Sequence, residues 1–109
     1  MILGEISKLQ YNNKMKNNLQ QYKKELVEVF SKISGNRGLM EEFLKDILTP
    51  VEFETMALRW QIVKKLNNGE THRDVAGDLG LGISTVTRGS REMRNKNGGF
   101  VLVLKKLGK

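Results

Sequence analysis

The sequence predicts an all-α protein of six helices, and three kinds of observation support this fold class. Apolar residues recur at steps of three and four along most of the chain, which is the spacing of an amphipathic helix. Threonines suited to helix N-caps precede two expected helices, at Thr49 and Thr71. Glycines follow where these helices should end, at Gly69 and Gly80. Together these signals divide the chain into short helical segments.

The first eighteen residues show no sustained apolar period and mix asparagine, lysine and single apolar residues. We interpret residues 1–18 as a flexible arm. Lys14 and Lys16 could contact DNA phosphates, although a solvated tail is the interpretation we favour. The remainder, residues 19–109, is expected to form a single helical domain for dimerisation and DNA binding.

Two amphipathic helices are expected between Leu19 and Ile47. The first is indicated by apolar residues at helical spacing, which are Leu19, Tyr22, Leu26, Val29, Phe30 and Ile33. The second has a wide apolar face for its length, formed by Leu39, Met40, Phe43, Leu44 and Ile47. Such width implies burial on more than one side. Since one subunit offers only a thin core, we infer packing against a second copy; a compact monomeric bundle is the alternative.

The sequence signals for a third helix are clear, whereas those for a last helix are ambiguous. Thr49-Pro50-Val51-Glu52 combines an N-cap, a proline at the first helical position and a glutamate three residues after the cap. This helix should run to Gly69. After a glycine-containing break at residues 95–99, the run from Phe100 to Leu107 suggests a last short helix, although its FVLVL segment would also suit a strand.

The segment 71–93 predicts a helix-turn-helix, in which a glycine turn joins two short helices. Thr71 is an N-cap type, and Asp74 stands three residues on, as in a variant of the capping box. Gly80 stands where a left-handed residue would end the first helix. Apolar residues at helical spacing lie on both sides of the turn, namely Val75, Ala76, Leu79, Ile83, Val86 and Met93. The small side chain of Ala76 should let the two helices approach closely.

The outward positions of the second helix favour contact with a DNA major groove. They carry short hydroxyls and guanidiniums, which can bond to base edges or phosphates. These residues are Ser84, Thr85, Thr87, Arg88 and Arg91. The residues that we expect to contact DNA are His72, Arg73, Ala76, Ile83, Ser84, Thr85, Thr87 and Arg91. The alternative is the solvated surface of an ordinary helical hairpin.

The distribution of charge supports a polyanionic partner. The net charge is +7; residues 1–58 hold eight basic and eight acidic residues, and residues 59–109 hold eleven and four. The excess therefore lies in the half that carries the helix-turn-helix. A basic face binds DNA by releasing counterions. An inert basic surface is the alternative.

Composition argues against several other classes of protein. The chain lacks cysteine, so it has no disulfide or thiolate metal site. His72 is the sole histidine and has no matched acidic pair, so we predict no catalytic residue, no metal site and no enzyme. No apolar run is long enough to span a membrane, and no signal peptide is visible, so we expect a cytoplasmic protein without a membrane partner.

Three segments resemble the tryptophan operon repressors. They are ILTP at Ile47–Pro50, RWQIVKKLNNGE at Arg59–Glu70 and LGLGISTVTRGS at Leu79–Ser90, and the last is the most specific. The order of the six helices agrees with that family as well. The resemblance implies an intertwined homodimer built on the N-terminal helices, and a repressor that binds a double-stranded operator under the control of a small ligand.

The resemblance also implies a corepressor pocket for L-tryptophan, with no other cofactor. In that family the indole lies between two arginines, which correspond here to Arg59 and Arg88; a flat guanidinium stacks well on an indole. Thr49 of the partner subunit and Gly89 fall on further pocket positions. Glu92 stands where the family usually has a serine near the ligand's amino group, and a carboxylate there could pair with the ammonium.

The sequence also departs from the family pattern elsewhere. Asp46 replaces an apolar residue that helps to close the pocket, and one residue is missing between Glu70 and Thr71. Ala76 and Arg91 differ from the family's usual residues on the DNA side. Two alternatives to a ligand-controlled repressor therefore stay open, a ligand-independent DNA-binding regulator and a basic helical protein-interaction module.

Overall fold

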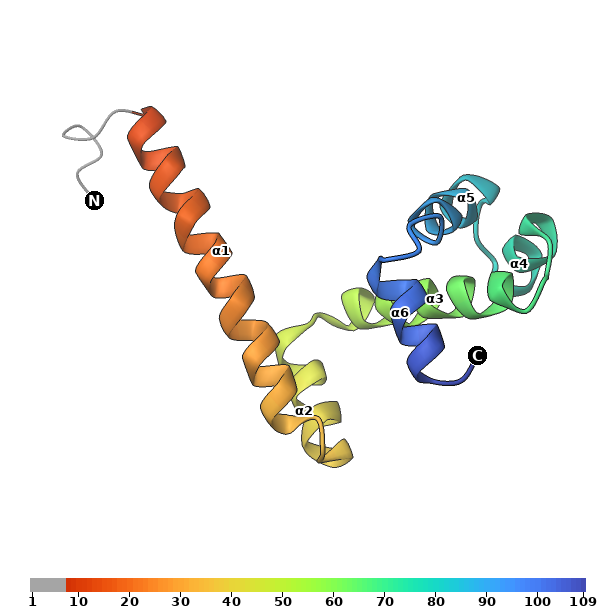
Figure 1. The fold of residues 1–109 in the computed structure, drawn as a ribbon, viewed down its shortest axis with the longest axis horizontal. Coiled ribbons are helices and arrows are strands. Elements are labelled where there is room, and N and C mark those ends of the chain that lie inside the picture. The colour runs from red at the N-terminus through yellow and green to blue at the C-terminus, as the bar shows by residue number, and fades with distance from the viewer. Residues whose placement is uncertain (1–7) are drawn as a thin grey trace. The chain divides into compact units, whose positions relative to one another are not determined.

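The computed structural model describes residues 8–109, and this part of the chain is helical throughout, with short connections and no strand (Figure 1). The helices are α1 (Lys8–Ile33), α2 (Arg37–Ile47), α3 (Pro50–Asn67), α4 (His72–Leu79), α5 (Ile83–Glu92) and α6 (Gly99–Lys106). The all-α prediction is therefore confirmed. Within this range no helix combines the length and the apolar character needed to cross a membrane.

The chain divides into two compact units, residues 1–47 and 48–109, where we expected a single domain over residues 19–109. The first unit holds α1 and α2. Asn36 joins the two helices, since its backbone N–H donates to the carbonyl of Ile33 at 2.9 Å and its side chain accepts from the N–H of Leu39 at 3.0 Å. The rings of Phe30 and Phe43 then pack edge to face, with centroids 5.5 Å apart.

Helix α1 begins at Lys8, well before the start at Leu19 that we predicted. The flexible arm predicted over residues 1–18 is therefore wrong for residues 8–18, while residues 1–7 lie outside the described part. The segment between Lys8 and Ile33 has no proline or glycine, and its lysines and glutamines are good helix formers. A helix needs no apolar period to continue through such residues once its neighbours have nucleated it.

The second unit begins with the capping box predicted for α3. The side chain of Thr49 accepts from the N–H of Glu52 at 3.2 Å, and the Glu52 carboxylate accepts from the N–H of Thr49 at 2.8 Å. The bond from the backbone N–H of Thr49, and after it the Thr49 hydroxyl near the carboxylate, hold the pKa of Glu52 below its ordinary value. The reciprocal pair fixes the first turn of α3 at the boundary between the two units.

The predicted helix-turn-helix is present as α4 and α5. Thr71 caps α4 by accepting from the N–H of Asp74 at 3.1 Å, which is the backbone half of the expected box. Gly80 ends α4 in the left-handed region at φ 65°, as predicted, because a side chain there would be strained. The next N–H, of Leu81, donates to the carbonyl of Ala76 at 2.9 Å, and α5 starts after Gly82.

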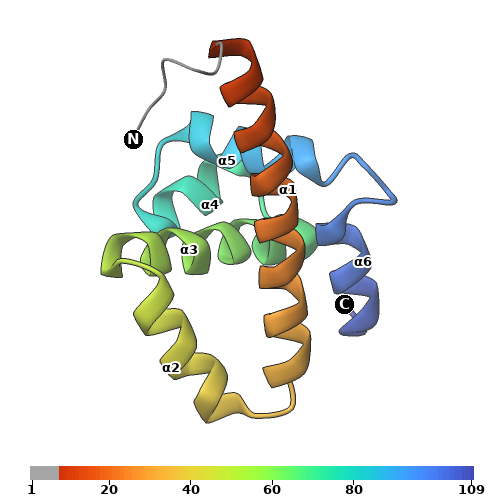
Figure 2. The same cartoon turned by 90° about the vertical axis from the view of Figure 1, so that its left-hand side faces the viewer.

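A small core joins α3, α4 and α5, which lie together in Figure 2. Its fully or almost fully buried residues are Ile62, Val75, Ala76 and Val86. Leu66, Leu79 and Leu81 surround them and are partly buried. The turn therefore closes a three-helix unit in which α3 supports both helices of the helix-turn-helix.

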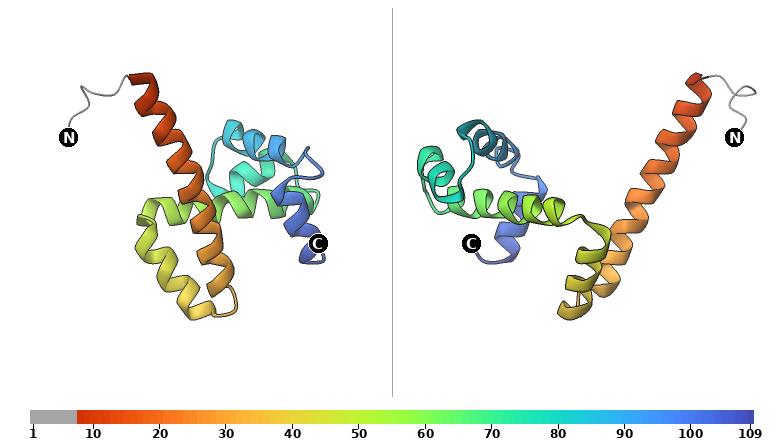
Figure 3. Two further views of the ribbon diagram at one scale, coloured as in Figure 1. Left: turned by 60° about the vertical axis from the view of Figure 1, so that its left-hand side comes forward. Right: turned by 180° about the vertical axis from the view of Figure 1, so that it is seen from behind.

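Helix α6 lies beside α3 in the two views of Figure 3. Its backbone is helical over Gly99–Lys106, so the strand that the FVLVL run also suited is not formed. Leu104 is the buried residue of this helix, at 3% exposure. Leu102, Val103 and Leu107 instead keep about half of their surface exposed, at 52%, 46% and 55%. Helix α6 therefore presents an apolar surface that the described residues leave partly exposed.

We expect acid to weaken the start of α3. Because the pKa of Glu52 is lowered in the folded state, its contribution to stability is complete above the ordinary glutamate pKa and is lost as pH falls through the lowered value. Between about pH 5 and pH 3, the melting temperature of the wild type should fall more than that of Glu52→Gln. Thermal unfolding followed by circular dichroism measures this difference, and Glu54→Gln is the control. Parallel curves for the wild type and Glu52→Gln would contradict the prediction.

Candidate functional site

The helix-turn-helix exposes most of the polar residues that the sequence singled out. Arg73 at the start of α4 is exposed, as are Ser84, Thr85, Arg88 and Arg91 along α5. Ile83, at the start of α5, is 51% exposed. The structure thus presents hydroxyls, guanidiniums and one apolar side chain on the surface of α5. Such a set can bond to phosphates and base edges and can touch a thymine methyl group.

A side-chain contact ties the beginning of α4 to α5. The Nδ1 atom of His72 lies 3.5 Å from the hydroxyl oxygen of Thr87, at the outer limit of a hydrogen bond. Both residues were expected to contact DNA, and the structure places them next to each other. The contact gives His72 and Thr87 a part in orienting the two helices, in addition to any role toward a ligand.

Ala76 does not lie on the exposed surface. It is 5% exposed and belongs to the core with Val75 and Val86. The predicted DNA contact of Ala76 is therefore wrong, since almost none of its surface is accessible. Its small side chain instead permits the close approach of the helices, which was the other role that the sequence suggested for it.

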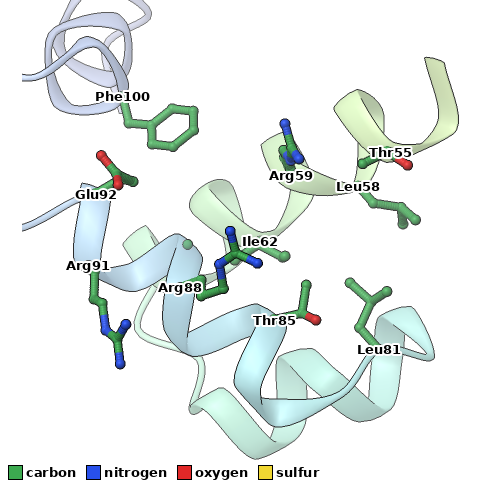
Figure 4. A pocket seen from close by; sticks show the side chains of 11 residues that line it. Thr55, Leu58, Arg59, Ile62, Leu81, Thr85, Arg88, Arg91, Glu92 and Phe100 are labelled. Carbon is green, nitrogen blue, oxygen red and sulfur yellow. The ribbon is translucent and has the colours of Figure 1, made fainter. Parts of the chain in front are cut away.

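A cavity of about 490 Å³ lies between α3 and α5 (Figure 4). Arg59 on α3 and Arg88 on α5 both line this cavity. Glu92 and Phe100 lie at one end of the cavity, and Leu58 and Leu81 lie at the other. The full lining is Thr55, Leu58, Arg59, Ile62, Leu81, Thr85, Arg88, Gly89, Arg91, Glu92 and Phe100.

The chemistry of this cavity is that of a site for a small amphipathic molecule. Its centre has two guanidiniums, which bind carboxylates and stack on flat rings. Glu92 follows Arg88 by one helical turn and forms no ion pair with another side chain of residues 12–109. Its carboxylate is therefore available to a cationic group. Leucine side chains and the ring of Phe100 supply apolar contacts at the two ends.

Gly89 allows α5 to approach α3 at the floor of the cavity. A Cβ atom built on Gly89 would lie 2.8 Å from Cγ2 of Ile62, a distance that real side chains do not reach. Ile62 is itself 2% exposed and cannot move away freely. A residue larger than glycine would consequently push the two helices apart.

The structure brings together four of the five residues expected at the corepressor site, namely Arg59, Arg88, Gly89 and Glu92. Thr49 is absent from the lining of this subunit's cavity, and its side chain caps α3. Its contribution to the pocket of a partner subunit stays a prediction. Arg91 also borders the cavity, but Figure 4 shows its guanidinium turned away from Arg59. The predicted contact of Arg91 with DNA is therefore compatible with its position and stays a prediction.

Several lining residues were not singled out from the sequence. Thr55 precedes Arg59 by four residues on α3, and Leu58 precedes Ile62 by four, so helical spacing could have found both. Phe100 belongs to α6, beyond a glycine-containing loop, and no spacing rule connects it with Arg59. A second, more open hollow of about 450 Å³ shares Phe100 and Glu92 with the main cavity and extends to Trp60.

Comparison with known proteins assigns the chain to a family. A family model described as "Trp repressor protein" matches residues 20–108. The chain belongs to the Trp repressor family. Relatives described as "Trp operon repressor homolog" come from Vibrio campbellii and Vibrio cholerae, each 40% identical over 58 residues. Another, from Aliivibrio fischeri, is 33% identical over 63 residues.

The similarity to these relatives covers only part of this chain and part of each relative. It covers 52% of this chain for the two Vibrio proteins and 57% for the Aliivibrio protein. The matched segments span 58%, 56% and 58% of the relatives themselves, a little over half of each. No solved structure matches the chain significantly.

We expect Gly89→Ala to disturb the cavity and the fold together. The added methyl group collides with Ile62, so the variant should lose ~1–3 kcal/mol of stability as α5 shifts away from α3. The control is Gly77→Ala on α4, where a Cβ atom meets nothing within 4 Å, so this variant should stabilise the helix by up to ~1 kcal/mol. Urea unfolding of the two variants measures both effects. Equal stabilities would show that the close approach at Gly89 is unimportant.

Proposed function

We propose that this protein is a transcriptional repressor that binds a double-stranded operator through α4 and α5. The observation that carries the proposal is the hydroxyl and guanidinium surface of α5, in a chain of the Trp repressor family. The recognition helix of a helix-turn-helix lies in the major groove. Here that helix is α5, fixed by buried Val86 and bearing Ser84 and Thr85 outward.

The active form in this proposal is a homodimer. Among residues 12–47 no side chain is fully buried, although α1 and α2 carry many apolar residues. Met15, Leu19, Tyr22 and Leu26 of α1 remain 36–59% exposed, at the 4-3-4 spacing of one helix face. A second copy that covers these residues gives the first unit the core that it lacks. In such a two-fold dimer the two copies of α5 contact half-sites about 34 Å apart, which is one helical turn of DNA and the usual spacing for dimeric helix-turn-helix proteins.

The ligand in this proposal is L-tryptophan, held between α3 and α5. Arg59 and Arg88 provide guanidiniums for the indole face and the carboxylate, and Glu92 provides a carboxylate for the ammonium. A ligand in this position contacts both the supporting helix and the recognition helix. It therefore favours one orientation of α5, and it increases DNA affinity to the extent that it binds that orientation more tightly.

The DNA half of the proposal is tested at Arg73. A duplex is first selected from a random pool with the wild-type protein, and affinities are then measured by fluorescence anisotropy. Arg73→Ala should weaken binding by ~1–3 kcal/mol if the guanidinium contacts a base, because that side chain is exposed at the start of α4. Arg37→Ala, an exposed arginine of α2, is the control. Equal affinities for the wild type and Arg73→Ala would argue against DNA recognition by this face.

The ligand half is tested at Arg88 by calorimetric titration with L-tryptophan. The wild type should bind, and Arg88→Ala should bind about 10- to 100-fold more weakly, because a charge-assisted hydrogen bond is lost. Arg94→Ala, an exposed arginine just beyond α5, should leave the affinity unchanged. Absence of heat with the wild type at millimolar ligand would exclude tryptophan as the corepressor.

A further inference from the structure

We propose that the first part of α1, residues 8–24, is a second DNA-binding surface that contacts phosphates without sequence preference. We call residues 8–24 the basic segment. The inference rests on the proposed DNA binding, but it involves none of the residues of α4, α5 or the cavity. Most of the basic segment precedes residue 20, where the match to the family model begins.

The charge of the basic segment is one-sided. It contains five lysines, Lys8, Lys14, Lys16, Lys23 and Lys24, and no aspartate or glutamate. Its charge of +5 compares with +7 for the whole chain. The first acidic residue of α1 is Glu25, directly after the segment. The net charge of residues 1–58 hides this concentration of lysines, because aspartates and glutamates between residues 25 and 58 offset most of it.

The lysines of the segment whose side chains are described form no ion pairs, unlike Lys45 and Lys65. Lys14, Lys16, Lys23 and Lys24 are exposed, and none forms an ion pair with a side chain of residues 12–109. By contrast, Lys45 lies 3.4 Å and 3.6 Å from carboxylate oxygens on its own helix. The ammonium groups of these four lysines are thus available to a polyanion.

One face of the segment consists of amides and an ammonium. Asn13, Asn17, Gln20 and Lys24 follow one another at steps of four, three and four residues. Each stands two residues before a member of the exposed apolar set, so the two stripes lie on opposite sides of the helix. The polar stripe therefore stays accessible when a second copy covers the apolar one. Lysine, asparagine and glutamine are among the side chains that bond to phosphate oxygens.

Duplex DNA suits this surface better than an anionic membrane does. A helix that lies in a membrane interface needs a broad apolar face opposite its charges. Here the described apolar side chains of the segment are Met15, Leu19 and Tyr22, a narrow stripe that the proposed dimer buries. Helical order also fixes the lysines relative to one another, which reduces the entropy lost when they bind a regular array of phosphates.

The test compares two full-length triple variants with equal loss of charge. Lys14, Lys16 and Lys24 are changed to glutamine in one, and Lys105, Lys106 and Lys109, exposed at the C-terminal end, are changed in the other. Affinity for a random duplex is measured over a range of salt concentrations. Each lost phosphate contact flattens the plot of log affinity against log salt by ~0.9, so the first variant should flatten it by ~1–3. The C-terminal variant should keep the wild-type slope.

Equal slopes for the two triple variants would overturn the inference, because the effect would then belong to net charge alone. Wild-type binding to phosphatidylglycerol vesicles that the first variant loses, with its DNA slope unchanged, would also overturn it and favour a membrane. Circular dichroism verifies that the first variant keeps its helices, and glutamine is a good helix former. Failure of the proposed function looks different: the random pool yields no preferred duplex, and Arg73→Ala and Thr85→Ala leave DNA binding unchanged.

Discussion

The contact between α5 and the two helices beneath it is the constraint on which the structure depends. Val86 is fully buried against Val75 and Ile62, and Gly89 brings the backbone of α5 close to Ile62. A core of so few residues offers little redundancy, because each buried side chain supports more than one helix pair. The direction of α5, and hence of all its outward side chains, is set by this contact.

The same contact shapes the cavity. Helix α5 therefore belongs both to the core and to the proposed ligand site. Arg88 and Glu92 lie on α5 one turn apart, while Arg59 faces them from α3. A molecule between the two helices meets the recognition helix from the side of the cavity, while Ser84 and Thr85 remain exposed on it. Under the proposed function, coupling between ligand and DNA would need no long pathway, because both would act on the orientation of a single ten-residue helix.

The first unit differs from the second in how little of its apolar surface is buried. Its helices are amphipathic but bury no side chain completely among residues 12–47. In the proposed dimer such a unit would gain its hydrophobic stabilisation from the second copy, as is common where one subunit has too little apolar surface to enclose. In that proposal the apolar stripe of α1 would contact the second copy, and the polar stripe on the opposite side of the helix would stay exposed.

Local signals in the sequence were sufficient for most of the fold. Thr49, Thr71 and Gly80 act through bonds and dihedral angles within a few residues, so the starts of α3 and α4 and the end of α4 were predicted correctly. The start of α1 was missed because its first residues lack the apolar period on which the prediction relied. Arg59, Arg88, Gly89 and Glu92 were found through family resemblance, and no rule of spacing would have paired α3 with α5 at that point.

By itself the sequence determined the helices α3, α4 and α5 with their caps and turns, and that positive charge accompanies the helix-turn-helix. These properties depend on neighbours along the chain. Only the tertiary structure decided that Ala76 is buried rather than exposed, that Phe100 closes one end of the cavity, and that Gly89 meets Ile62. Those outcomes depend on how helices distant in sequence pack, and packing is fixed by the shapes of many side chains at once.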